Sequence, residues 1–138
     1  MLAVDDEVRD WLRRARDDRL AAGLVVPHGL FDLACWLSQQ CAEKALKGLL
    51  VAAGVRPEKT HALDVTLRQL AEAGIVLPTL AMPAAKLTPL AVAVRYPGIG
   101  HMTELAALSA MSEADVVLVE VEQQFRLRAG VADLTQAK

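Results

Sequence analysis

Apolar side chains recur every three or four residues over several long stretches of the chain, which is typical of amphipathic α-helices. Residues 5–24 form the first such stretch, and its other face mixes arginines with acidic side chains. Residues 30–53 form the second and strongest, and Gly54 follows as a helix stop. The two apolar stripes comprise Val8, Trp11, Leu12, Ala15 and Ala22, and then Phe31, Ala34, Cys35, Ala42, Ala45, Leu46, Leu49 and Ala53.

The middle of the chain predicts two shorter helices. Residues 62–72 carry leucines at helical spacing, with Thr60 or His61 at the start and Gly74 at the end. Residues 83–96 repeat the pattern but contain Pro89. Either Thr88 caps a new helix with Pro89 in its first position, or Pro89 kinks one longer helix.

A last helix is predicted from about Ser112, where Ser-Glu-Ala-Asp resembles a capping sequence. The run VVLVEV within it also suits a β-strand, but its length and the cap favour a helix. The pattern as a whole predicts an all-α fold, an antiparallel up-and-down bundle of four to five helices. We expect a single domain over residues 1–130 and a flexible tail over 131–138.

Composition narrows the class of protein. Hydrophobic residues make up 54% of the 138 residues, which is enough for a core, and the net charge is −2. A general nucleic-acid binder would need a basic face, but a small local phosphate site stays compatible with this charge. Cys35 and Cys41 lie about 1.7 turns apart on one predicted helix, so we expect two buried thiols, consistent with a reducing cytoplasm.

Several kinds of site and segment are not expected. The N-terminus is acidic where a signal peptide is basic, and no run of eighteen apolar residues predicts a membrane span. The two cysteines and three histidines have no zinc-ligand spacing, and no glycine-rich phosphate loop or Ser-His-Asp arrangement is recognisable. We therefore expect neither a metal nor a cofactor. The carboxylates of Asp17 and Asp18 are expected to face solvent.

The segment RYPGIGH, residues 95–101, places unusual chemistry at a helix end. A turn through its glycines can bring the imidazole of His101 towards the guanidinium of Arg95. Arginine binds phosphate with a planar fork of donors, and histidine transfers protons near neutral pH. On RNA, His101 would handle the proton of the 2′-hydroxyl or of the leaving oxygen, and Arg95 would stabilise charge on phosphorus.

The longest predicted helix also carries a recognisable motif. The sequence ACWLSQQCAEKALKGLLVAAG, residues 34–54, resembles the signature helix of the HEPN family, with Gln40, Glu43, Lys44 and Lys47 on its pattern. KTHALDVTLRQL resembles the family's Thr-His start of the next helix, which contains His61. VRYPG resembles the Arg-Tyr-Pro end of the fourth helix. The resemblance spans roughly residues 10–125, in family order.

This resemblance implies a compact helical bundle that commonly forms homodimers and is encoded beside a minimal nucleotidyltransferase. Several branches of the family are metal-independent ribonucleases with an Arg-x4–6-His motif at the dimer interface, and many are toxins or defence effectors. Arg95 and His101 fit that motif as catalytic residues. Gln40, Glu43 and His61 would be structural signature residues, and Lys44, Lys47 and Tyr96 would contact nucleotide or phosphate.

Three hypotheses stay open at this point. The first is an RNA-cleaving toxin whose two chains join Arg95 and His101 in one cleft. The second is a non-catalytic module that binds a nucleotide or a nucleotidyltransferase partner. The third is a structural dimer in which Arg95 pairs with Glu43 or Asp18 in a buried network, because buried charges need partners. All three predict a cytoplasmic protein without a membrane segment.

Overall fold

The computed structural model describes residues 2–94, 97–98 and 100–128. The regular elements of that part of the chain are all helices and include no strand, so the helical interpretation of VVLVEV is confirmed. The elements in chain order are α1 (Asp6–Val25), the 3-10 turn η1 (Val26–His28), α2 (Phe31–Ala52), α3 (Leu63–Glu72), the 3-10 turn η2 (Pro78–Leu80), α4 (Ala81–Leu87), α5 (Leu90–Ala93) and α6 (Glu104–Arg128).

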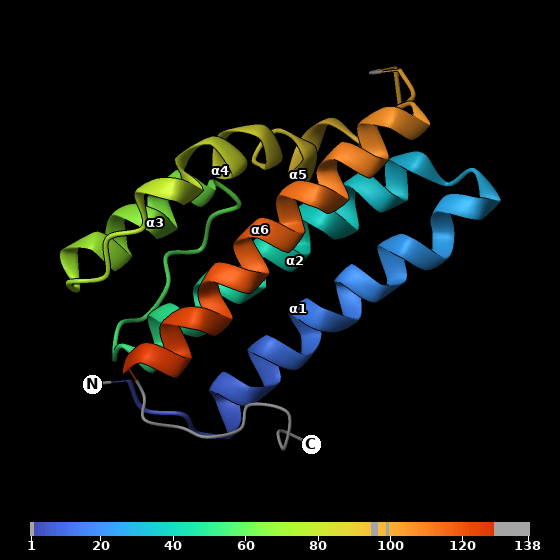
Figure 1. Cartoon of the computed structure of the whole chain (residues 1–138). Coiled ribbons are helices and arrows are strands. Elements are labelled where there is room, and N and C mark those ends of the chain that lie inside the picture. Colours follow the sequence, from blue (N-terminus) through green and yellow to red (C-terminus); the bar gives the residue numbers. More distant parts are fainter. Residues whose placement is uncertain (1, 95–96, 99, 129–138) are drawn as a thin grey trace.

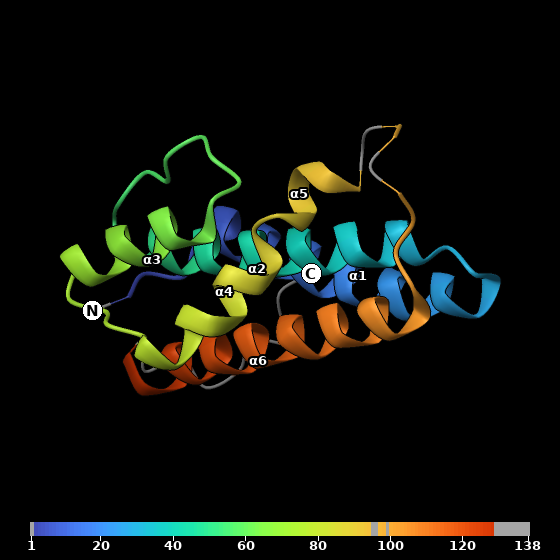
Figure 2. The same cartoon turned by 90° about the horizontal axis from the view of Figure 1, so that it is seen from above.

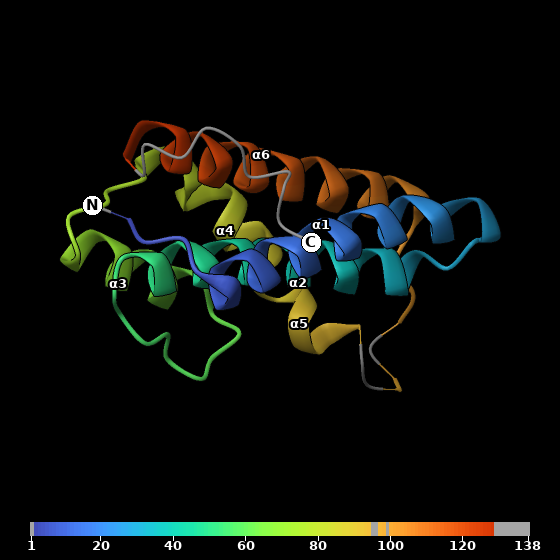
Figure 3. The same ribbon diagram turned by 90° about the horizontal axis from the view of Figure 1, so that it is seen from below.

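The three long helices α1, α2 and α6 run alongside one another, with α2 and α6 parallel to each other and both antiparallel to α1 (Figure 1). Figures 2 and 3 show α6 on one side of α2, and α3 with α5 on the other side. The core lies around α2, which is buried along most of its length. The largest fully buried apolar side chains of the core are Phe125, Leu12, Leu46, Leu49, Leu50, Leu63, Leu70, Leu80 and Leu87.

The start of α1 is capped by an acidic side chain. The carboxylate of Asp5 accepts a hydrogen bond from the backbone N–H of Val8 at 3.0 Å. Asp6 and Glu7 occupy the first turn, where negative charge interacts favourably with the helix dipole. The bounds of α1, α2 and α3 all fall within one or two residues of the prediction.

The prediction that the last helix begins near Ser112 is wrong. The helix α6 begins at Glu104, and the Oγ1 of Thr103 accepts a hydrogen bond from the backbone N–H of Ala106 at 3.1 Å. Thr103 is therefore the cap, and Ser112 lies inside the helix. The segment between them is rich in alanine and leucine, which have high helix propensity, so α6 continues through the second capping signal.

Pro89 separates two helices. The helix α4 ends at Leu87 and α5 begins at Leu90, so the segment predicted over 83–96 is divided at Thr88 and Pro89. The hydroxyl of Thr88 donates to the carbonyl of Ala84 at 2.8 Å and accepts from the backbone N–H of Leu63 at 3.1 Å. Thr60, which was predicted at this helix start, accepts the backbone N–H of Ala62 at 3.1 Å, so Thr60 and Thr88 both supply acceptors there.

Ion pairs join α1 to both of its neighbours. Arg19 holds Asp115 of α6 through two hydrogen bonds of 2.6 and 3.0 Å, and this pairing raises the pKa of the Arg19 guanidinium. Towards α2, Lys44 Nζ lies 2.6 Å from Asp18 Oδ2. The side chain of Asp18 is only 18% exposed. The expectation of solvent exposure is therefore wrong for Asp18, because Lys44 compensates its charge.

Among the helices of the described residues, none is long and apolar enough to cross a lipid bilayer.

Candidate functional site

Glu43 is the centre of a buried polar network on α2. Its Oε1 lies 2.8 Å from Nδ1 of His61 and accepts a hydrogen bond from Nε2 of Gln39 at 3.2 Å. Its Oε2 accepts from Nζ of Lys47 at 3.2 Å. The residues Gln39, Glu43 and Lys47 are all buried, so their polar groups depend on one another rather than on water.

The same network fastens the loop between α2 and α3. Nζ of Lys47 donates to the carbonyl of Thr60 at 2.9 Å, and Nε2 of Gln39 donates to the carbonyl of His61 at 3.1 Å. Gln40 donates in turn to Oε1 of Gln39 at 2.7 Å. Backbone carbonyls of the loop therefore replace the water that these side chains lose, and the loop is fixed against α2.

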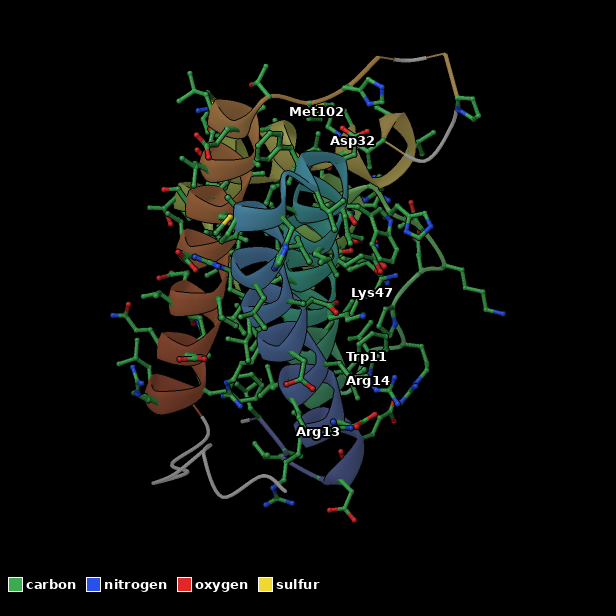
Figure 4. All side chains as sticks on the ribbon, turned by 90° about the vertical axis from the view of Figure 1, so that its right-hand side faces the viewer. Trp11, Arg13, Arg14, Asp32, Lys47 and Met102 are labelled. Carbon is green, nitrogen blue, oxygen red and sulfur yellow. The ribbon has the colours of Figure 1, made fainter. Side chains whose placement is uncertain are left out.

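His101 takes part in a second carboxylate–imidazole pair. Its Nδ1 lies 3.4 Å from Oδ2 of Asp32, which belongs to the first turn of α2. The other oxygen, Oδ1, accepts the backbone N–H of Met102 at 2.7 Å. Figure 4 shows Asp32 and Met102 together where the chain from α5 reaches α6. One carboxylate thus anchors the loop and also faces the ring of His101.

This second pair joins an exposed imidazole to a carboxylate. The side chain of His101 is 96% exposed. A carboxylate at Nδ1 favours the tautomer that carries its proton on that nitrogen and leaves Nε2 as the acceptor. Nε2 can then accept a proton from a substrate hydroxyl, and Asp32 can stabilise the resulting imidazolium.

Sequence comparison now identifies the domain, since a profile of the HEPN domain matches residues 8–124. The chain belongs to the HEPN domain family. A comparison with curated protein sequences gives no significant match.

Two solved structures are similar to this HEPN chain. TT1696 from Thermus thermophilus has a TM-score of 0.79 and 31% sequence identity, over 87% of this chain and 99% of that one. ST0689, described as an archaeal HEPN homologue, has a TM-score of 0.69 and 31% identity, over 85% of this chain and 96% of its own. The all-helical bundle expected from the sequence is therefore confirmed as a HEPN fold.

The HEPN signature residues of α2 mostly face inward. Gln40 and Glu43 are buried members of the network, and His61, from the loop before α3, pairs with Glu43 although its own side chain is 51% exposed. Lys47 is part of that network too, and its side chain is 10% exposed. Lys44 is held by Asp18. Both lysines, predicted to contact phosphate, thus have carboxylate partners within the chain.

Two of the predicted site residues, Arg95 and Tyr96, lie outside the described residues. The preceding helix α5 ends at Ala93 and packs against α2. On α2, Nε1 of Trp36 is buried and has no hydrogen-bond partner among the described residues. Trp36 lies one turn beyond Asp32, so a buried donor occupies the same stretch of helix as the His101 pair.

Sequence reasoning missed Asp32. The residue precedes the family signature and resembles an ordinary acidic side chain in the first turn of a helix. It contacts His101 and Met102 across about seventy positions of chain. The sequence offered one local sign of a role for Asp32, namely that its carboxylate lies on the same helix face as Glu43.

The two thiols are unsuited to reaction. Cys35 and Cys41 are both fully buried and form no disulfide. Burial raises the pKa of Cys35 to about 11 and that of Cys41 to about 12. Since the thiolate is the nucleophile, both behave as small apolar core groups near neutral pH. Within the described ranges, no cluster of three or more potential metal ligands occurs.

Proposed function

We propose that this HEPN protein is a metal-independent endoribonuclease of a toxin–antitoxin or defence system. The observation that carries the proposal is the pairing of His101 with Asp32, which leaves Nε2 of an exposed imidazole facing solvent. Asp32 also binds the backbone beside that histidine, so the ring is anchored at a defined place on the bundle.

In the proposed reaction, the 2′-hydroxyl of RNA attacks the adjacent phosphorus and the bond to the 5′-oxygen breaks. Nε2 of His101 accepts the proton of the attacking hydroxyl or, when protonated, donates one to the leaving oxygen. Arg95 contributes positive charge to the pentavalent phosphorus in the transition state. The products are a 2′,3′-cyclic phosphate and a 5′-hydroxyl, so the reaction needs no external nucleophile.

A second copy of the chain completes the proposed site. A cleft between two subunits would hold two Arg95 and two His101 side chains, so one imidazole can act as base and the other as acid. Exposed leucines near the His101 pair support a contact there. Leu33 follows Asp32 directly and is 40% exposed, and Leu105 in the first turn of α6 is 77% exposed.

The test is cleavage of labelled RNA in EDTA by the purified protein and three variants. His101→Ala is expected to lower the rate at least 100-fold, because general acid–base catalysis contributes that much. Asp32→Asn is expected to lower it less, since the ring stays but loses its charged partner. His28→Ala changes an exposed histidine of η1 and should leave the rate unchanged.

Equal cleavage by the wild-type protein and His101→Ala would exclude His101 as the catalytic group. No cleavage by the wild-type protein would favour the second candidate, a non-catalytic module that binds a nucleotide or a minimal nucleotidyltransferase. The outer face of α6 favours a protein partner. It exposes apolar side chains opposite the core at helical spacing, namely Leu105, Leu108, Val116, Val119 and Leu127.

The two candidates differ in their response to a change on that face. For the binding module, Val119→Asp is expected to abolish association with a transferase, whereas for the ribonuclease it is expected to leave RNA cleavage by the isolated protein intact. Co-elution of the two proteins in size-exclusion chromatography measures the association. Co-elution that survives Val119→Asp would contradict a partner contact on the outer face of α6.

A further inference from the structure

Two carboxylate–imidazole pairs share one face of α2. Asp32 pairs with His101, and Glu43 pairs with His61. The two carboxylates are eleven residues apart, which is about three helical turns and about 16 Å along the axis. They therefore project in nearly the same direction. Figure 4 shows Asp32 and Lys47, one turn beyond Glu43, along the same side of the helix.

The segments that supply the two histidines lie on the same side of the bundle. In Figure 2, the loop before α3 and the chain that follows α5 both rise above α2, away from α6. The helix α5 lies between them and exposes Val92, whose side chain is 52% exposed. The two imidazoles thus flank a short helix with an apolar residue on its surface.

Both rings offer the same atom to a ligand. Each Nδ1 faces its carboxylate, so Nε2 is the free nitrogen in both cases. The side chain of His61 is 51% exposed, whereas Glu43 behind it is 8% exposed. Because Lys47 balances the charge of Glu43, a protonated His61 leaves this cluster with a net positive charge. The exposed Lys59 lies two positions before His61 and adds a further cation.

We infer that His61 is a second phosphate contact for a single-stranded nucleic acid whose reacting phosphate lies at His101. The inference rests on the proposed ribonuclease function. It specifies that the substrate is a single strand long enough to contact both histidines. The carboxylates behind the two rings are about 16 Å apart along α2, which at about 3.4 Å per nucleotide of a stacked strand corresponds to roughly five nucleotides. A mononucleotide or dinucleotide is too short to reach both imidazoles.

The main test compares oligonucleotides of different length. Fluorescence anisotropy measures binding of a 2′-deoxy dinucleotide and a 2′-deoxy octanucleotide, which lack the attacking hydroxyl, at about pH 6, where histidine side chains generally carry charge. His61→Ala is expected to weaken octanucleotide binding about 5- to 10-fold and to leave dinucleotide binding unchanged. The slope of log K against log salt for the octanucleotide should fall by about 0.7, because one phosphate contact is lost.

Two further variants separate a phosphate contact from a structural role. His61→Gln keeps an amide donor towards Glu43 but removes the imidazole, and should give the same loss as His61→Ala. His28→Ala removes an exposed histidine elsewhere and should change nothing. Equal losses for both lengths, full octanucleotide affinity in His61→Ala, or rescue by His61→Gln would each overturn the inference.

Cleavage kinetics keep this inference distinct from the proposed function. With an octaribonucleotide substrate, His61→Ala should raise KM and leave kcat unchanged, whereas His101→Ala should lower kcat. If the wild-type protein fails to cleave but shows the length-dependent loss of binding, the ribonuclease proposal fails and the extended nucleic-acid site stands. If cleavage occurs and is independent of His61 at every substrate length, the ribonuclease proposal stands and the inference that His61 contacts phosphate fails.

Discussion

Gly48 of α2 lies so close to Trp11 of α1 that a methyl group on Gly48 would sit 2.9 Å from the Cβ of Trp11. The neighbouring atom belongs to the base of a large side chain and is fixed by the α1 backbone. Gly48→Ala is therefore expected to destabilise the protein by about 1–3 kcal/mol, because the two helices must move apart. Urea denaturation of both proteins measures the difference.

Gly23 provides the matched control, since it also lies inside a helix. A methyl group there would meet the end of the flexible Arg19 side chain at 3.5 Å, which is an ordinary contact. Gly23→Ala is expected to stabilise the protein by up to about 1 kcal/mol through helix propensity alone. A similar gain for Gly48→Ala would contradict the close approach of α1 and α2.

The pair formed by Lys44 and Asp18 is expected to stabilise the fold rather than to bind phosphate. Both side chains are about four-fifths buried, so removing Lys44 should cost about 1 kcal/mol or more, between the values for exposed and buried pairs. A double-mutant cycle with Lys44→Ala and Asp18→Ala measures the coupling. A coupling energy near zero, together with weaker nucleotide binding in Lys44→Ala, would restore the phosphate role.

Removal of Glu43 is expected to be more damaging. Glu43→Ala leaves the Lys47 ammonium buried without its carboxylate, and such a change costs about 3 kcal/mol. The double variant Glu43→Ala/Lys47→Met should recover part of that loss, because the uncompensated charge is gone. Chemical denaturation measures the loss of stability, and amide exchange of residues 55–62 measures how firmly the loop is held. If amide protection of residues 55–62 is unchanged in Glu43→Ala, the network does not hold that loop against α2.

The buried thiols predict a loss of stability at alkaline pH. The pKa values of Cys35 and Cys41 are raised to about 11 and about 12 in the folded protein, from 9.0 for a free thiol. Above pH 9 the unfolded chain binds fewer protons than the folded one, so the free energy of unfolding falls as pH rises. The loss is up to about 1.4 kcal/mol per pH unit for each thiol. Well below pH 9, where the thiols are protonated in both states, they contribute no pH dependence.

Comparison with a Cys35→Ala/Cys41→Ala variant isolates that contribution, since other groups titrate in the same range. The wild-type protein should lose stability faster than the variant between pH 9 and pH 11. Parallel pH profiles for the two proteins would show that the thiols ionise as readily in the folded state as in the unfolded chain.

Much of the fold could be predicted because helical periodicity is a local signal. Residues 30–53 bury one continuous stripe, and the observed helix α2 matches the prediction closely. The start of α6 was missed because Ser112 and Thr103 carry similar capping signals, and only the fold selects between them. The chain divides at Pro89, but Thr88 does not cap the second helix: Pro89 is the cap residue of α5, and the Thr88 hydroxyl bonds Ala84 and Leu63, a distant contact that no local pattern reveals.

The site was harder to predict because its contacts join distant parts of the chain. The polar residues of α2 were expected to form the opposite face of an amphipathic helix, but Gln39, Glu43 and Lys47 are covered by the loop before α3. A sequence shows the polarity of such a face, but it does not show that another segment will satisfy its hydrogen bonds. The role of Asp32 has the same origin, since His101 lies sixty-nine positions away.

The hydroxyl of Thr88 has a consequence for the order in which the chain folds. It provides the first N–H of α3 with an acceptor twenty-five positions away, and no side chain local to that helix caps its start within the described residues. A helix of ten residues is marginal by itself in water, so α3 depends on its packing against α2 and α4 and on the bond to Thr88. We therefore expect α1, α2 and α6 to form early and α3 to join late, after closure of the loop that ends at Thr88.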